Sequence, residues 1–169
     1  MEFETLYQEL RQGVEIIQAL VTGMTQAEAQ IRPAPEAWSM LEVMGHLVDE
    51  ERDDFRMRID LTLNHPGKQW PPIHPSAWVT ERRYNERDLK QALDAFLAER
   101  AQSLTFLKGL KNANWDASHL SEFGERTAGQ LLASWVAHDH LHMRQLVELR
   151  WAKVQKISAP YPIEYAGDW

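Results

Sequence analysis

The sequence predicts an all-α fold, a four-helix bundle that forms a single domain over residues 1–169. Four segments repeat their apolar residues at the three-and-four spacing of an amphipathic helix. Two of these segments open with a capping-box pattern, which marks the start of a helix. No segment shows the sustained alternation of apolar and polar residues that is typical of strands. A chain of 169 residues is long enough to bury one substantial core.

The first two predicted helices cover residues 3–24 and the segment from Ser39 to Asn64. Ser39 marks the second start because Ser39 and Glu42 can each accept a hydrogen bond from the other's backbone N–H. A Pro-Gly pair at 66–67 ends this helix, since proline cannot continue the hydrogen-bond ladder.

The third predicted helix covers residues 89–107, and the fourth runs from Thr127 to about Val154. Thr127 and Gln130 form the second capping-box pattern. The connections between the four helices are each about 15 residues long, well above the usual length of a helix–helix loop. Simple hairpins need shorter loops, so we expect at least one connection to cross the end of the bundle.

Composition and charge exclude several classes of function. The formal net charge is −7, whereas a non-specific nucleic-acid binder needs a basic surface. The same charge argues against docking to anionic membranes, and no apolar run approaches the roughly 18 residues of a membrane span. The absence of cysteine excludes disulfides, thiolate ligands and a cysteine nucleophile. The first residues lack the pattern of a signal peptide, so we expect a cytoplasmic protein.

Three histidines lie within five positions of the fourth predicted helix. At about 100° per residue, His138 and His142 lie about 40° apart and share a face, whereas His140 points about 180° from their midpoint. The shared face also carries Trp135 and Leu146, so it is the face that enters the core. Two buried imidazoles need partners, which are either a metal ion or hydrogen bonds to a neighbouring helix. The pair alone does not decide between these two.

The second predicted helix offers a third histidine, His46, on a largely apolar face that also carries Val43, Met57 and Leu61. Facing helices of a bundle are where metal sites are built from inward side chains. Three neutral imidazoles suit a divalent metal such as zinc, nickel, iron or copper, and they leave one or more positions open to water or substrate. We therefore predict a metal site that the last helix shares with His46.

Acidic residues follow His46 closely. Glu50 lies one turn beyond it and is a candidate either to orient its ring through the second nitrogen or to act as a catalytic base. Asp49 is a second candidate to orient a ring. The simpler expectation for Asp49, Glu51, Asp53 and Asp54 is a solvated face.

The sequence resembles the DinB/YfiT-like family of four-helix-bundle, metal-dependent enzymes over essentially the whole chain. The resemblance rests on PAPEAWSMLEVMGHLVDEE at 33–51, on the pair His138 and His142, and on IEYAGDW at 163–169. It implies a divalent metal held by His46, His138 and His142, crossover connections, and frequent homodimers. One departure concerns the residues after the last histidine. Many relatives have Arg-Gly-Gln there, whereas this chain has Met-Arg-Gln, which turns Arg144 about 100° from the family position.

A second apolar stripe on the last helix surrounds His140 and faces away from the predicted metal site. It consists of Val136, Met143 and Val147. An apolar stripe needs cover, and a homodimer interface would bury the same stripe on both copies. Burial under a loop or the C-terminal tail would cover it equally well.

Three functions compete on this sequence. The first, ranked narrowly ahead, is a hydrolase that uses water activated by the metal on a small-molecule substrate. The second is a transferase of a low-molecular-weight thiol, an activity that the family resemblance implies for some members. The third is a metal-containing binding module without turnover. The tryptophans near the predicted helix ends are candidates for an apolar entrance to the site: Trp38, Trp70, Trp78 and Trp115.

Overall fold

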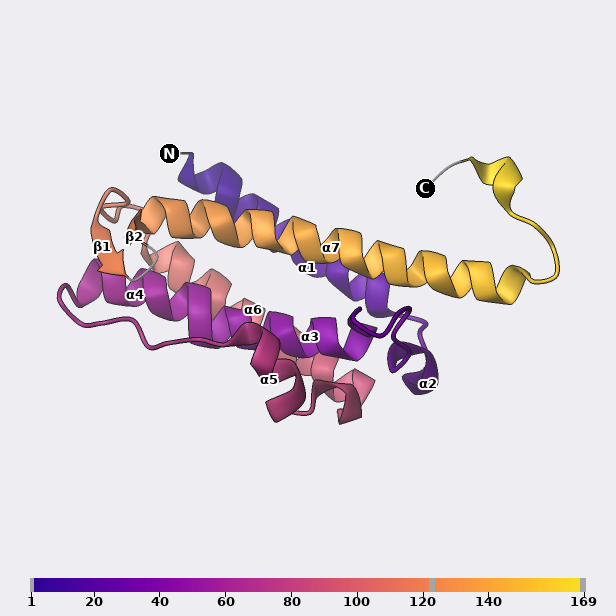
Figure 1. Ribbon diagram of the computed structural model, residues 1–169. Coiled ribbons are helices and arrows are strands. Elements are labelled where there is room, and N and C mark those ends of the chain that lie inside the picture. Colours follow the sequence, from indigo (N-terminus) through magenta and orange to yellow (C-terminus); the bar gives the residue numbers. More distant parts are fainter. Residues whose placement is uncertain (1, 122–123, 168–169) are drawn as a thin grey trace.

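The computed structural model of the protein describes residues 2–121 and 124–167 and shows an elongated helical bundle (Figure 1). The four long helical segments are α1 (Phe3–Val21), α3 (Met40–Asp49) continued by the π-helix η1 (Glu50–Phe55) and α4 (Arg56–Asn64), α6 (Leu89–Gly109), and α7 (Ala128–Ser158). These are the four predicted helices, so the predicted fold class is confirmed. Asp168 and Trp169, the end of the IEYAGDW segment, lie outside the described residues.

Short elements fill the long connections. The helical ones are α2 (Gln26–Ala29), α5 (Pro75–Glu81), η2 (Tyr84–Glu86) and η3 (Glu164–Ala166). Strands β1 (Ser118–Ser121) and β2 (Gly124–Thr127) form an antiparallel hairpin in which Ser118 lies opposite Thr127. The sequence did not predict this hairpin, because four residues per strand are too few to show a sustained alternation.

Both predicted capping boxes are present. The Ser39 hydroxyl accepts from the Glu42 backbone N–H at 3.2 Å, and the Glu42 carboxylate accepts from the Ser39 N–H at 2.8 Å. At the start of α7, Thr127 and Gln130 make the same exchange at 3.1 and 2.9 Å. These bonds pair backbone N–H groups that a helix start leaves without partners, so they fix where the two histidine-bearing helices begin.

The connections cross the bundle. Helix α1 packs mainly against α7 and α6, and α3 packs mainly against α6 and α7. Helices α1 and α3 therefore occupy opposite corners, as do α6 and α7, although each pair is consecutive along the chain. The connection through α2 and the connection through the β-hairpin thus each span a diagonal, which confirms the expected crossover topology.

The π-helix η1 changes the phase of the second long helix. It lies where the sequence predicted an uninterrupted α-helix, and a π-turn inserts one extra residue, which rotates everything after it by about 100°. The predicted face with Met57 and Leu61 is wrong beyond this point. Arg58, Ile59 and Thr62 are buried instead, at 8%, 0% and 4% exposure.

Two apolar clusters form the core and leave a polar level between them. One surrounds Phe96 and Met44, and the other surrounds Trp135 and Phe55. Between the two clusters, the inward positions of the long helices are polar or small, from Gly13 on α1 through His46, Glu51, Arg100 and His138. The histidines and the residues around Arg100 thus lie in one polar layer between the two apolar clusters.

The second apolar stripe of α7 is covered in part by α1. Val136 and Met143 are each 8% exposed, and Val136 belongs to the same apolar cluster as Leu10 of α1. A Cβ at Gly13 of α1 would lie 2.9 Å from the Met143 Cε, so this glycine permits the close approach. Val147 remains 37% exposed. Contact within the chain therefore accounts for most of the stripe.

Helix α7 is longer than its partners. It has 31 residues, against 19 in α1 and 21 in α6, and its last turns project beyond the bundle (Figure 1). Neither α7 nor any other helix in the described part of the chain is both long and apolar enough to cross a membrane.

Candidate metal centre

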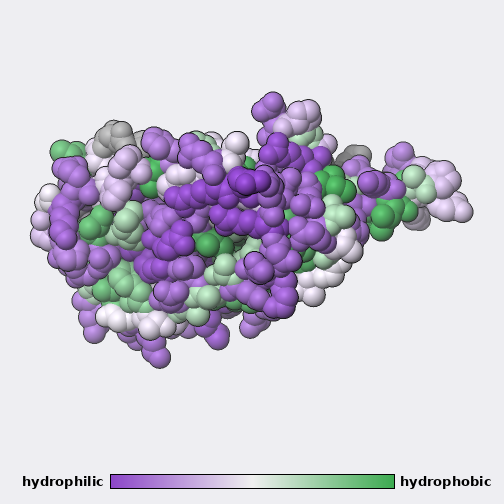
Figure 2. All heavy atoms as spheres, turned by 90° about the horizontal axis from the view of Figure 1, so that it is seen from below, coloured by the Kyte–Doolittle hydropathy of each residue, from purple (hydrophilic) through white to green (hydrophobic). Residues whose placement is uncertain are grey.

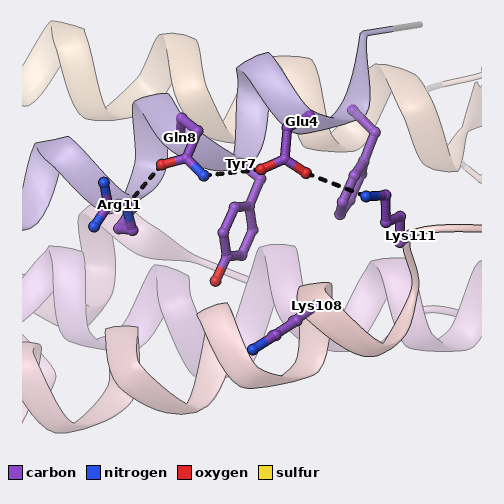
Figure 3. A pocket seen from close by; sticks show the side chains of 7 residues that line it. Glu4, Tyr7, Gln8, Arg11, Lys108 and Lys111 are labelled. Atoms are coloured by element: carbon purple, nitrogen blue, oxygen red, sulfur yellow. Dashed lines mark hydrogen bonds and ion pairs between the residues drawn. The ribbon is translucent and has the colours of Figure 1, made fainter.

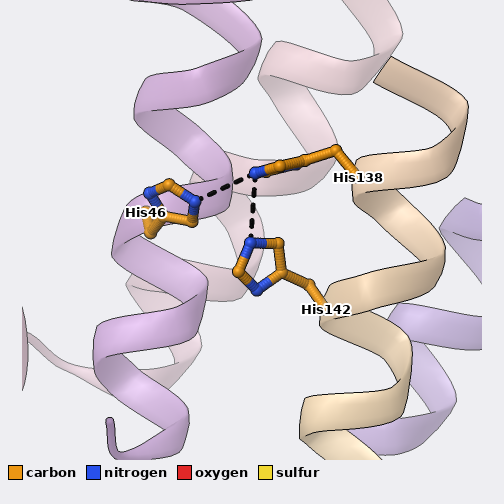
Figure 4. A group of neighbouring side chains, drawn as sticks. All are labelled: His46, His138 and His142. Atoms are coloured by element: carbon orange, nitrogen blue, oxygen red, sulfur yellow. Dashed lines mark hydrogen bonds between the residues drawn. The ribbon is translucent and has the colours of Figure 1, made fainter. Parts of the chain in front are cut away.

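Three histidine side chains converge at the polar level of the bundle (Figure 4). The Nε2 atom of His138 lies 3.1 Å from the Nε2 of His46 and 3.1 Å from the Nε2 of His142. One ring nitrogen from each residue lies within 4.8 Å of the others. The structure thus brings together the three residues that helix geometry and the family resemblance selected. His140 lies elsewhere, with its Nε2 atom 3.5 Å from a carboxylate oxygen of Glu9 on α1.

The donor set fits a divalent cation. Three nitrogens face one point, and a single proton placed between them cannot pair all three lone pairs. A tetrahedral zinc ion with bonds of about 2.0–2.1 Å separates its nitrogen ligands by roughly 3.3–3.4 Å, close to the 3.1 Å of two of the three pairs. Imidazole nitrogens also suit nickel and iron. The cluster is therefore arranged as a metal site with room for a further ligand.

The surroundings keep the three rings neutral. Burial, together with the neighbouring imidazoles, lowers the pKa of His46 to about 3 and that of His138 to about 2. Burial also lowers the pKa of His142, although Gln145 and Asp139 act in the opposite direction. Neutral imidazole is the form that binds a metal, so the site is ready to bind a cation at physiological pH.

The second nitrogens of two rings have polar neighbours. The Nδ1 of His142 lies 2.9 Å from the side-chain oxygen of Gln145, so an Nδ1–H donates there and the lone pair is left on Nε2, toward the centre. The Nδ1 of His46 lies 3.7 Å from a Glu50 carboxyl oxygen. The sequence analysis did not identify Gln145, although its position three residues after His142 places both on one face.

Glu50 lies on the outer side of the His46 ring. Its closest approach is to Nδ1, whereas the Nε2 atom faces the other histidines. Burial and the nearby Asp54 carboxylate raise the pKa of Glu50 to about 9, and Arg58 acts in the opposite direction. The 3.7 Å between the Glu50 carboxyl oxygen and the His46 Nδ1 is beyond hydrogen-bond distance, so the two roles expected for Glu50 stay predictions.

Aromatic rings close two sides of the site. The Trp38 ring stacks parallel to His142 at 6.3 Å and meets His46 edge-on at 5.0 Å, while Phe55 meets His138 at 5.3 Å. Only Trp38 of the four predicted entrance tryptophans touches the histidines in these contacts. The other three pack against His119, Arg82 and Phe3.

A buried charge cluster lies at the same level. Arg100, which is fully buried, donates to Glu51 at 2.6 and 2.8 Å and to Asp139 at 2.7 and 2.8 Å. Its guanidinium also donates to the backbone oxygen of Leu10 at 2.9 Å, and the Trp135 indole N–H donates to Glu51 at 2.9 Å. Every nitrogen of the Arg100 guanidinium is therefore paired.

The expectation of a solvated acidic face is wrong for three of the four acids. Asp49, Glu51 and Asp54 are 2%, 1% and 7% exposed. Asp49 is buried because α3 is buried along its whole length, and the π-helix turns Glu51 and Asp54 into the bundle. Asp49 does not contact a histidine. It accepts from the Tyr84 hydroxyl and pairs with Arg82 at 2.7 Å, so its predicted role in orienting a ring is wrong.

A separate pocket between α1 and α6 contains no histidine (Figure 3). Its volume is about 360 Å³, and it is lined mainly by polar side chains of the two helices. Several of these pair with one another: Gln8 donates to Glu4 at 2.9 Å, and Arg11 donates to Gln8 at 2.7 Å. Within residues 2–121 and 124–167, the three histidines are the group arranged to hold a metal ion.

Comparisons with known proteins agree with the fold. A family model described as the DinB superfamily matches residues 9–146. The chain belongs to the DinB superfamily. Among solved structures it is similar to YfiT from Bacillus subtilis, with a TM-score of 0.78 and 19% sequence identity over 88% of this chain and 85% of that one. That protein is described as a probable metal-dependent hydrolase with an unusual four-helix bundle topology. No curated protein matches the sequence significantly.

The chain departs from the family's Arg-Gly-Gln pattern after His142, and its arginine there lies outside the centre. Arg144 is exposed on 73% of its side-chain surface and pairs with Glu148 at 3.3 Å. Gln145, the residue that the chain shares with the Arg-Gly-Gln pattern, contacts His142 instead. The centre in this chain therefore has a glutamine beside it and no arginine from this segment.

Proposed function

We propose that this protein is a metal-dependent hydrolase whose divalent ion, zinc, nickel or iron, is held by His46, His138 and His142. The observation that carries the proposal is the convergence of the Nε2 atoms of three neutral histidines, without a hydrogen-bond arrangement that pairs all of them. Buried polar atoms without partners are rare in native proteins, and a cation is a common reason for them.

Three protein ligands favour catalysis over a purely structural metal. A structural zinc site is usually closed by four protein ligands, whereas catalytic sites keep a position open. No fourth acidic or histidine ligand joins the three within the described residues. His138 and His142 are only partly buried, whereas His46 is 5% exposed, so the solvent-facing side of the centre lies along α7.

The metal and the residues around it would have different roles in the reaction. A divalent ion bound here would supply a Lewis acid that activates water and polarises the bond to be cleaved. Gln145 holds the His142 ring in the tautomer that presents Nε2. Glu50 lies on the Nδ1 side of His46 at 3.7 Å and would fix that ring only by moving into hydrogen-bond distance. Trp38 and Phe55 exclude water from two sides of the centre, which strengthens electrostatic interactions inside it.

The choice of hydrolysis rests on the similarity to YfiT as well as on the site. That protein and this chain share the fold at 19% identity, and its description as a probable metal-dependent hydrolase motivates the choice of reaction. Transfer of a low-molecular-weight thiol is the competing reaction. Nothing in the contacts of the centre identifies a pocket for such a thiol, so hydrolysis stands first.

The test is a substrate screen with the metal-loaded, tag-free protein. Panels of esters, amides and electrophiles should be incubated with and without a low-molecular-weight thiol. The proposal predicts cleavage that needs the metal, does not need the thiol and is lost in His142→Ala but kept in His140→Ala. Thiol consumption in place of water-dependent cleavage would contradict it, as would activity that survives His142→Ala.

A further inference from the structure

Two buried arginines, Arg58 on α4 and Arg100 on α6, differ in how their guanidinium groups are paired. Every guanidinium nitrogen of Arg100 donates a hydrogen bond. Arg58 is 8% exposed and meets a carboxylate through Nε alone, which lies 2.8 Å from an Asp54 oxygen. Its two Nη groups have no hydrogen-bond or ion-pair partner within residues 2–121 and 124–167. A buried cation with unpaired N–H groups is costly, so this arrangement indicates a missing acceptor.

Trp70, in the connection between α4 and α5, lies against the Arg58 guanidinium. The Cζ atom of Arg58 is 4.9 Å from the centre of the Trp70 ring, which is a cation–π contact. This contact holds the guanidinium in place but uses none of its N–H groups. The indole N–H of Trp70 is itself enclosed and has no acceptor in the part of the chain that the structure describes. The ring therefore adds a further unpaired donor beside Arg58.

His119 of strand β1 lies on the same tryptophan. Its ring stacks on that of Trp70, with ring centres 4.6 Å apart and planes 13° from parallel. His119 is 8% exposed, and its Nε2 atom is enclosed without a partner among the described residues. An imidazole nitrogen can carry a proton and donate it. Three separate elements thus bring nitrogen groups together in one place, and we call this set the donor cluster: Arg58, Trp70 and His119.

The donor cluster is accessible from solvent. The Nη groups of Arg58 are not enclosed, unlike its Nε, and Trp70 is only half-buried. The connection that carries Trp70, residues 65–74, runs along the lower edge of the bundle in Figure 1. Figure 2 is seen from that side and shows a mainly hydrophilic surface on which hydrophobic residues form small patches. Such a surface favours a small polar ligand over an apolar partner.

The chemistry of the donor cluster selects an oxyanion. Its unpaired groups are all nitrogens that donate or can donate, and the guanidinium carries a permanent positive charge. That charge disfavours a cation as the ligand. A guanidinium with both Nη groups free matches the two oxygens of a carboxylate or a phosphate. Asp54 occupies the Nε side, so it fixes the direction in which the Nη groups of Arg58 point.

We propose that the donor cluster is a binding site for the carboxylate or phosphate group of a small molecule. The Nη groups of Arg58 hold two oxygens of the anion, and Trp70 and His119 donate their ring N–H groups to it. The site is separate from the metal centre, because Arg58 follows His46 by twelve residues, roughly 18 Å along the helix axis. It depends neither on the metal nor on the proposed reaction.

The first test follows the indole N–H signals of the full chain by NMR, with and without zinc, as acetate or inorganic phosphate is added. The Trp70 signal, assigned with Trp70→Phe, should move saturably, and equally with and without zinc. The anion that binds more tightly identifies the acidic group of the ligand. Trp115 is the matched control, since its indole N–H is also enclosed and unpaired but its ring stacks on Phe3. A Trp70 signal that moves no more than it does in chloride would show that water alone fills the cluster and would overturn the proposal.

Substitutions test the roles of the side chains. Arg58→Lys keeps the charge but loses the paired Nη groups, so the dissociation constant of the anion should rise about tenfold or more. Trp70→Phe keeps the ring but removes the N–H, and it should raise the constant by up to about tenfold, measured from the His119 ring signals. Arg56→Lys, on the same helix and paired with Glu99 at 2.5 Å, is the control and should bind like the wild type. Circular dichroism checks that each variant folds. Equal affinities in Arg58→Lys and Arg56→Lys would contradict the proposal.

Discussion

The bundle holds two buried polar clusters at the same level, and they differ in the partners of their side chains. Around Arg100, one cation lies between two carboxylates, and each guanidinium nitrogen donates a hydrogen bond. Around His138, three neutral rings turn their nitrogens toward one another, with no anion between them. The chain supplies both the cation and the carboxylates of the first cluster, whereas it supplies only the metal ligands of the second.

This difference separates a structural group from a functional one. A buried ion pair with its hydrogen bonds made holds helices in register, and removing one partner leaves an unpaired charge in the core. A cluster of unpaired lone pairs is tolerated in the interior when a ligand completes it. Asp139 links the two clusters, since it binds Arg100 and follows His138 directly.

The largest effect is expected from the Arg100 cluster. Arg100→Met would leave Glu51 and Asp139 buried without their cation, and we expect a loss of about 3–5 kcal/mol in the free energy of unfolding. Urea denaturation of the metal-free protein measures it. The control is Arg144→Ala, whose exposed pair with Glu148 contributes at most about 1 kcal/mol. Equal losses of unfolding free energy in Arg100→Met and Arg144→Ala would contradict a structural role for the Arg100 cluster.

The histidine cluster should affect stability chiefly through the metal. An ion present at 100 times its dissociation constant stabilises the folded state by about 2.7 kcal/mol if it binds only that state. His138→Ala should lose this gain, and in chelator it should destabilise the protein much less than Arg100→Met does. Thermal melts with and without chelator provide the measurement. A wild-type melting temperature that no divalent metal raises would count against the site.

Replacing a residue that orients a histidine ligand should weaken metal binding without changing the number of ions bound per chain. Gln145→Leu removes the acceptor for the His142 Nδ1–H and should weaken metal binding by about 10–100-fold while one ion per chain is still bound. Competition with a chelator of known affinity measures this. Arg144→Leu, next to Gln145 and exposed, should leave the affinity unchanged. An unchanged affinity in Gln145→Leu would show that the contact does not orient the ring.

Acid should destabilise the metal-free protein through the histidines. An unfolded histidine has a pKa near 6.5, whereas burial lowers the pKa of His46 to about 3 and that of His138 to about 2. The stability that depends on these neutral histidines is therefore fully present above pH 6.5. Below that pH, the free energy of unfolding falls by about 1.4 kcal/mol per pH unit for each histidine. Urea unfolding in chelator should show a shallower decline in His138→Ala. Parallel declines in both proteins would contradict the pKa directions.

Local signals account for what could be predicted from the sequence. Apolar spacing located the four long helices, and the pairs Ser39 with Glu42 and Thr127 with Gln130 marked two of their starts. Helical phase separated His140 from His138 and His142, because an angle of about 180° within one helix needs no tertiary information. The same phase argument failed after Glu50.

The failures have identifiable physical causes. A π-turn depends on how the helix packs, and nothing in EERDDF distinguishes it from an α-helical turn, so Met57 and Leu61 were predicted on the wrong face. The partners of Arg100 lie 49 and 39 residues away on other helices, and no local pattern connects them. Charged residues are usually solvated unless they are paired, so a buried acid can be expected only once its cation is located.

Metal stoichiometry in four single alanine variants tests the central claim most directly. Tag-free wild-type protein, loaded with zinc and freed of excess ion, should carry one ion per chain by elemental analysis. His46→Ala, His138→Ala and His142→Ala should lose most of it, whereas His140→Ala should retain it, since the His140 ring lies near Glu9 on the far side of α7. An empty wild-type protein, or a site emptied by His140→Ala and kept by His142→Ala, would contradict the account.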